Sequence, residues 1–144
     1  MKVDCHVDPA IETEHADVWV KKMTPELSAL LQELSSQDQI LWCYREDEMR
    51  PVRLDDIFVI QTTDRGLDVS TRNEHFLCRR QLSAVREMLT DDFAEASRSA
   101  MINIRHIDHL ILLDNGAIDL IMKNQQRIPI ARRKLYFLKE RLGI

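Results

Sequence analysis

Two short segments of this chain place arginine where the backbone is expected to turn, and the first of them also carries serine. Residues 93–103 read FAEASRSAMIN, and residues 127–142 read RIPIARRKLYFLKERL. Arginine presents a rigid fork of N–H donors that matches the acceptors of a guanine edge or of a phosphate, and a serine hydroxyl adds a further hydrogen bond. These residue types point to nucleic-acid recognition.

Catalysis and metal binding find little support in the sequence. The chain has only three glycines and contains no GxSxG, P-loop, HExxH or dinucleotide-binding pattern, so we do not expect an enzyme. Cys5, Cys43 and Cys78 are far apart and odd in number, which fits neither a disulfide framework nor a CxxC metal site. His106 and His109 lack the further ligands that a zinc site of about four ligands needs. We therefore expect reduced thiols, no metal and no cofactor.

The distribution of charge matters more than its sum. A net charge of −4 opposes DNA binding, because Lys and Arg supply most non-specific affinity for phosphates. Residues 1–52, however, contain 5 Lys and Arg against 11 Asp and Glu, whereas residues 53–144 contain 15 against 13. From residue 93 onward the balance is 9 against 5. An acidic appendage on a DNA-reading module would show this asymmetry.

Length and composition bound the class of protein. The 144 residues, 44% of them hydrophobic, suffice for one domain and a small appended unit. No apolar run approaches the ~20 residues that span a bilayer, and the acidic N-terminus does not resemble a secretory signal. We expect the chain to act in the cytoplasm.

The first part of the chain is predicted to form a small α/β unit over residues 1–51. Residues 2–7, 18–20 and 40–44 favour strands. Thr24 and Pro25 supply an N-cap and a first helical position. The leucines that follow at helical spacing predict one amphipathic helix; they are Leu27, Leu30, Leu31 and Leu34.

From residue 52 the pattern changes to short strands separated by turns, which is typical of a mainly β domain. The expected strands are residues 57–62, 67–71, 75–79, 95–99, 107–113, 117–122 and 127–130. Helices are expected over residues 81–89 and 132–142, the latter ended by Gly143. Residues 101–105 are expected to form a tight connection, and Asn115-Gly116 predicts a type I′ hairpin turn.

This order of elements resembles the LytTR-type DNA-binding domain of bacterial transcriptional regulators. The first motif of that family is matched by Phe93, Arg98, Ser99, Ile102 and Asn103. The second is matched by Ile128, Pro129, Ile130, Arg132 and Arg133. Both motifs occur at the expected separation, and the resemblance covers about residues 52–142.

The resemblance implies an α+β, mainly β fold: an elongated stack of short antiparallel sheets with a C-terminal helix. It also implies that loops carrying Arg98 and Arg132 enter the major groove, while the turn at Arg65 approaches the DNA backbone. The full set of expected DNA-binding residues is Arg65, Arg98, Ser99, Arg132, Arg133 and Lys134. Phe93, Asn103 and Pro129 are assigned to structure, Asn103 as a cap of backbone groups.

Three positions depart from the family pattern. Ser97 stands where many relatives have histidine, and Ala131 stands where serine is usual before the basic pair. Each change removes a donor that could touch DNA. Glu95 places an acid close to the expected interface. The departures affect the contact list and the base sequence that is read.

The resemblance also implies partners and a domain division. We expect residues 52–144 to bind double-stranded DNA, as a dimer on paired direct repeats, without a receiver domain, for which the chain is too short. Residues 1–51 are expected to be regulatory, with a membrane-bound partner protein. The alternative is a protein-interaction module that uses a sheet edge and the acidic N-terminal unit.

Overall fold

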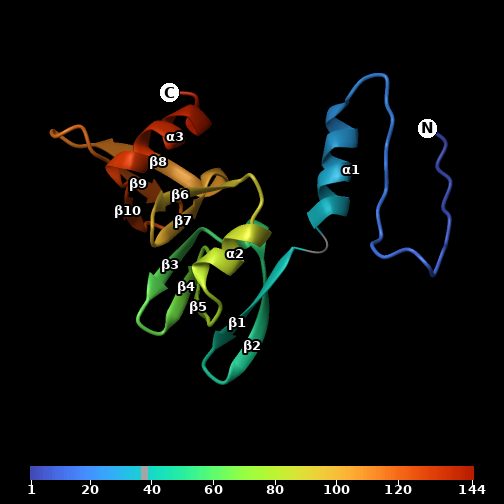
Figure 1. Ribbon diagram of the computed structural model, residues 1–144. Coiled ribbons are helices and arrows are strands. Elements are labelled where there is room, and N and C mark those ends of the chain that lie inside the picture. The colour runs from blue at the N-terminus through green and yellow to red at the C-terminus, as the bar shows by residue number, and fades with distance from the viewer. Residues whose placement is uncertain (37–38) are drawn as a thin grey trace. The chain divides into compact units, whose positions relative to one another are not determined.

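The computed structural model describes residues 1–36 and 39–144. The chain divides into two compact units, Met1–Leu34 and Ser35–Ile144, which are described separately (Figure 1). Within the described residues, no helix combines the length and apolar character needed to cross a membrane.

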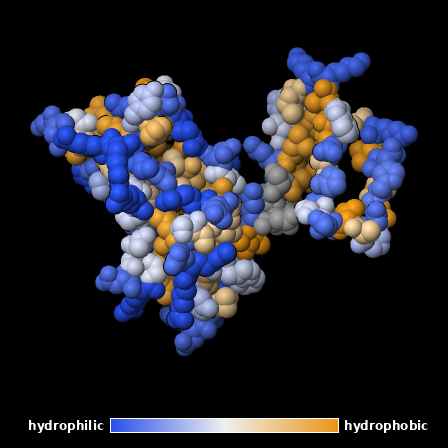
Figure 2. Space-filling view, viewed as in Figure 1, coloured by the Kyte–Doolittle hydropathy of each residue, from blue (hydrophilic) through white to orange (hydrophobic). Residues whose placement is uncertain are grey.

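The N-terminal unit contains all but the last two residues of helix α1 (Pro25–Ser36), the helix that the leucine spacing predicts. Thr24 caps it, because its Oγ1 accepts a hydrogen bond from the backbone N–H of Leu27 at 3.2 Å. The apolar stripe of α1 is visible as orange atoms in Figure 2, and Leu30 and Leu34 are 51% and 55% exposed.

The prediction of strands at residues 2–7 and 18–20 is wrong. Both segments are irregular, and all of their residues are exposed. A strand is stable only when its N–H and C=O groups pair with a neighbour and one of its faces is buried, and these short runs have neither.

The domain formed by Ser35–Ile144 begins with a hairpin that the sequence analysis assigned largely to the N-terminal unit. Its strands are β1 (Ile40–Arg45) and β2 (Glu48–Arg53), and β1 also pairs with β5 (His75–Cys78). Leu41 and Cys43 are buried in the domain core. The division therefore falls after Leu34, earlier than the expected boundary at residues 51–52, because this hairpin completes a larger sheet.

That sheet has seven strands in the order β2-β1-β5-β4-β3-β7-β6, so β2 and β6 are its edges. The remaining strands are β3 (Val59–Thr63), β4 (Gly66–Ser70), β6 (Phe93–Ser97) and β7 (Ala100–Asn103). A 3-10 turn, η1 (Leu54–Asp56), precedes β3, and a second, η2 (Ile104–His106), follows β7. Helix α2 (Leu82–Met88) connects β5 to β6.

Strand β7 corrects the expectation of a tight connection at residues 101–105. It pairs with both β3 and β6, and all four of its residues are buried. Ala-Met-Ile-Asn lacks the alternation of apolar and polar residues that marks a strand in a sequence. Its strand character becomes evident only from the two strands that pair with it.

The second sheet has three strands in the order β10-β9-β8, namely β8 (Ile107–Leu112), β9 (Ile118–Met122) and β10 (Arg127–Pro129). The β8–β9 turn is not type I′, since a type I′ turn needs positive φ at two residues and here only Gly116 (φ 82°) has it. Gly116 N–H bonds to the Leu113 carbonyl, and Leu113 N–H bonds to the Ala117 carbonyl. Helix α3 (Arg132–Leu142) follows and ends at Gly143, which has φ 73°.

Two hydrophobic cores hold the domain. One lies between the first strands and α2 and includes Leu41, Val69 and Val85. The other includes Ile102 of β7, Leu120 of β9 and Leu138 of α3, so it joins both sheets to the C-terminal helix. The expected fold class, mainly β with antiparallel sheets and a C-terminal helix, is confirmed.

Candidate nucleic-acid interface

The turn at Arg65 and the turn at Arg98 lie next to each other. Antiparallel pairing of β3 with β7 places Gln61 opposite Ala100, so the end of β3 meets the start of β7. Thr62 N–H also donates to the Ser99 carbonyl at 2.8 Å. The β3–β4 and β6–β7 turns therefore share one end of the sheet.

The start of α3 joins the same end through one backbone hydrogen bond. Ala131 N–H donates to the Ala96 carbonyl at 2.8 Å, which places Arg132 beside the last residues of β6. The structure thus brings together Arg65, Arg98 and Arg132, three residues from turns that are distant in sequence. We refer to the two turns and the first turn of α3 as the arginine edge.

Local sequence fixes the shape of both turns. Gly66 has φ 140°, and a Cβ there would lie 2.7 Å from the Cys78 carbonyl oxygen, so only glycine allows this close approach. The Thr63 hydroxyl donates to the Gly66 carbonyl at 2.9 Å and accepts from Arg65 N–H at 3.3 Å. In the second turn, Ser97 Oγ accepts from Ser99 N–H, also at 3.3 Å. These bonds hold the backbone of the two arginine-bearing turns.

The four arginines of the arginine edge make no direct contact with another side chain in the described residues, and Arg133 acts on Glu95 only through its charge, which helps to lower the pKa of that carboxyl. Arg65, Arg98, Arg132 and Arg133 are exposed, and within residues 1–36 and 39–144 none has an ion pair, a side-chain hydrogen bond or a ring contact. Ser99 is exposed as well, with its hydroxyl 3.3 Å from that of Ser97. The arginine edge therefore offers several unsatisfied donors to an anionic ligand.

The other ten arginines are all engaged within the chain. Six form ion pairs with carboxylates: Arg45, Arg50, Arg53, Arg86, Arg105 and Arg127. Arg72 and Arg79 lie over the rings of Phe58 and Tyr44. Arg80 contacts the sulfur of Met88, and Arg141 donates to the carbonyls of Asp91 and Phe93.

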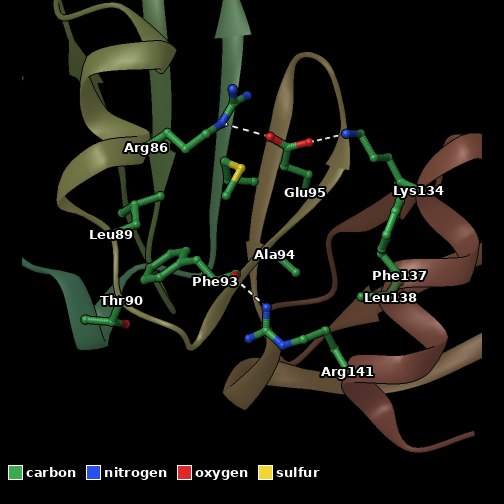
Figure 3. Close-up of a pocket in the computed structure, with 11 residues that line it drawn as sticks. Arg86, Leu89, Thr90, Phe93, Ala94, Glu95, Lys134, Phe137, Leu138 and Arg141 are labelled. Atoms are coloured by element: carbon green, nitrogen blue, oxygen red, sulfur yellow. Dashed lines mark hydrogen bonds and ion pairs between the residues drawn. The ribbon is translucent and has the colours of Figure 1, made fainter.

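Lys134 differs from its two basic neighbours in α3. Its ammonium pairs with one oxygen of Glu95, and Arg86 of α2 pairs with the other at 2.9 Å (Figure 3). The hydrogen bond from Lys134 lowers the pKa of Glu95 below its ordinary value, against the opposing effect of partial burial. The sequence analysis noted Glu95 as an acid near the interface but did not find its two partners, which lie 9 residues before it and 39 residues after it.

The three residues assigned to structure lie outside the arginine edge: Phe93 and Asn103 pair at the opposite end of β6 and β7, and Pro129 lies in β10. Phe93 is buried in the first core. The Asn103 amide donates to the Ile57 carbonyl at 3.0 Å, and its oxygen accepts from Arg105 N–H at 3.1 Å, which caps η2. Pro129 lies in β10, an edge strand, where a missing N–H breaks no ladder on the open side.

The histidines considered as metal ligands have other contacts. His106 Nε2 donates to the Asp55 carbonyl at 2.6 Å, and its ring stacks on Phe58 with centroids 4.1 Å apart. His109 pairs with Asp108. Within the described part of the chain, no three His, Cys, Asp or Glu side chains form a group that could hold a metal ion.

Comparisons with known proteins identify the family to which this fold belongs. Uncharacterized HTH-type transcriptional regulators of Staphylococcus aureus are similar over 100% of this chain and 99% of their own length, with 27% identity in strain bovine RF122 / ET3-1 and 24% in strain MSSA476. A solved LytTr DNA-binding domain from Bacillus cereus superposes with a TM-score of 0.69 at 19% identity, over 74% of this chain and 99% of that one. The sequence model of the LytTr DNA-binding domain matches residues 47–143, and the chain belongs to this family.

Proposed function

We propose that this protein is a sequence-specific DNA-binding transcriptional regulator that reads the major groove with Arg98 and Arg132. The observation that carries the proposal is the partner pattern of its 14 arginines. Ten are satisfied inside the chain, and the four that are not, within the described residues, all lie on the arginine edge. An arginine without an internal partner keeps its full donor fork for guanine or phosphate.

The residues of the arginine edge divide into two roles. Arg98 and Arg132 stand on adjacent turns and are assigned to base edges. Arg65, Ser99 and Arg133 are assigned to phosphates, which fix the register of the protein on the duplex. Lys134 shares the turn of Arg133, but its ammonium is already held by Glu95.

The test is a selection from a random duplex library with the full chain, followed by a salt titration on the selected duplex. We expect a defined sequence to emerge and log affinity to fall with log salt by roughly 0.9 per phosphate neutralised. Flat salt dependence, or no enriched sequence, would contradict the proposal and favour a protein-interaction module that uses a sheet edge.

Two copies on paired direct repeats are part of the proposal. Each domain has only four unpartnered arginines among the described residues, so a second copy is the simplest way to double the phosphate contacts and lengthen the site. The selected sequence should then contain the same half-site twice in one orientation. A single half-site bound with one-to-one stoichiometry would contradict this arrangement.

We also propose that the N-terminal unit binds a regulatory partner protein that resides in a membrane. Two observations support this proposal: the acidic composition of the unit and the exposed leucine stripe of α1. Exposed apolar patches on soluble proteins often mark interaction sites. Removing residues 1–34 should leave DNA affinity unchanged and abolish partner binding. Removing residues 1–50 should instead unfold the domain, because it deletes β1.

A further inference from the structure

The carboxylate of Glu95 lies between two helices that flank strand β6. In Figure 3, Arg86 reaches it from α2 on one side and Lys134 reaches it from α3 on the other. Oε1 lies 2.9 Å from Arg86 Nε, and Oε2 pairs with Lys134 Nζ. The side chains of Glu95 and Lys134 are only 25% and 28% exposed, so water screens their pair less than it screens a fully exposed one. Each carboxylate oxygen therefore has its own cation.

The first turn of α3 needs an anion that its own sequence does not supply. Its first three residues are Arg132, Arg133 and Lys134, it has no acidic residue in that turn, and Ala131 provides no side-chain cap. Positive charge is unfavourable at a helix N-terminus, where the backbone dipole is itself positive, and neighbouring cations repel one another. Glu95, reaching across from β6, is the carboxylate that offsets this charge.

We propose that Glu95 is a positioning and specificity-determining residue of the DNA interface. It holds the first turn of α3 in place and withholds Lys134 from phosphates, so that Arg132 and Arg133 are the only cations of this turn that contact DNA. Lysine is a point charge that attracts any phosphate, whereas arginine adds directional recognition. Keeping Lys134 occupied lowers affinity for arbitrary sequences more than for the correct one. The inference rests on the proposed function and defines how the same interface discriminates.

The decisive variant is Glu95→Gln in the full chain, since glutamine keeps the shape and removes the charge. The probe is a short duplex of arbitrary sequence, titrated with salt beside the selected duplex. Freeing Lys134 should steepen the salt dependence by about one unit and strengthen binding to the arbitrary duplex about five- to tenfold near 0.1 M salt. The ratio of specific to non-specific affinity should fall.

Two further variants identify the cation responsible. The double variant Glu95→Gln with Lys134→Met should return to the salt dependence of the parent. Lys134→Met alone should leave that dependence unchanged, because the lysine does not neutralise phosphate in the parent. Glu48→Gln is the matched control: it frees Arg50 of the β1–β2 hairpin, at the other edge of the sheet, and should leave binding to either duplex unchanged.

The outcomes separate this inference from the proposed function. Weaker binding of Glu95→Gln to both duplexes at an unchanged salt slope would show a purely structural role and overturn the inference. A slope lowered by about one unit in Lys134→Met would do the same, and that variant does not depend on Glu95→Gln folding. A parent that binds no duplex with steep salt dependence would instead refute DNA binding itself.

Discussion

The two edges of the seven-stranded sheet use arginine in opposite ways. At one edge, the β1–β2 hairpin carries Arg45, Arg50 and Arg53, and each is paired with a carboxylate at 2.6 to 3.8 Å. At the other edge, the β6–β7 turn carries Arg98, which has no such partner within the described residues. Surface arginines usually belong to the first kind. Under the proposed function, an interface is marked by arginine left without an internal partner and not by arginine content alone.

The largest effect is expected when single arginines are removed, two from the arginine edge and one from the β1–β2 hairpin. Arg98→Ala and Arg132→Ala should each cost ~1 to 3 kcal/mol of binding to the selected duplex, and each should relax preference at one base position. Arg50→Ala should cost nothing measurable, because it loses only an exposed ion pair with Glu48. Fluorescence anisotropy on the selected duplex and its single-base variants measures both effects.

Two results would break the comparison. Equal losses for Arg98→Ala and Arg50→Ala would show that charge, regardless of partner, governs binding. Equal weakening of Arg98→Ala on every base sequence would reduce Arg98 to a phosphate contact.

A smaller loss of affinity is expected from a substitution that keeps the positive charge of Arg98 but removes its guanidinium group. Arg98→Lys should weaken the selected duplex by about 1 kcal/mol and leave the arbitrary duplex nearly unchanged, because lysine still neutralises phosphate but cannot form the bidentate pair with guanine. Arg50→Lys is the matched substitution on the β1–β2 hairpin and should leave the affinity for either duplex unchanged. If Arg98→Lys binds the selected duplex like the parent, Arg98 does not read a base.

The positions of the free arginines could be predicted from sequence because they occur in local motifs. Arg98 lies in the turn directly after β6, and Arg132 follows Ile-Pro-Ile-Ala and opens a helix, so short windows suffice to locate them. The helices α1 and α3 were predictable for the same reason, since leucine spacing, Thr24 and Gly143 are local signals.

What could not be predicted depends on contacts between distant segments. Residues 2–7 have the composition of a strand but no neighbour to pair with, whereas Ala100–Asn103 lacks alternation and is a strand because β3 and β6 flank it. The hairpin of β1 and β2 belongs to the main sheet because β1 pairs with β5 at Tyr44 and Leu77. The two cations on Glu95 come from different helices, and no sequence window contains both.

The charge on Glu95 should also appear in the pH dependence of stability. Its pKa in the folded protein is lowered from the ordinary 4.5, mainly by the hydrogen bond from Lys134. A lowered pKa stabilises the fold fully above the unfolded value, and this contribution is lost as pH falls through the folded value. Urea unfolding of the parent and of Glu95→Gln should therefore differ at neutral pH, on the order of 1 kcal/mol or less after solvent screening, and converge in acid. A difference that persists below the folded pKa would contradict an electrostatic origin.

The smallest effect should come from the hydroxyl that holds the Arg98 turn. Ser97 Oγ accepts from Ser99 N–H at 3.3 Å, a long bond, so Ser97→Ala removes a weak restraint on the residue between them. We expect specific affinity to fall by about 0.5 kcal/mol, near the lower end for a neutral hydrogen bond, because Arg98 must then be ordered at greater entropic cost when it binds. Asn115→Ala is the matched control: it removes a similar bond, from Ala117 N–H to Asn115 Oδ1 at 3.0 Å, in the β8–β9 turn outside the arginine edge. Both variants should lose similar stability in a thermal melt, but only Ser97→Ala should lose affinity. If the two variants bind the selected duplex equally well, the order of the Arg98 turn before binding does not contribute to recognition.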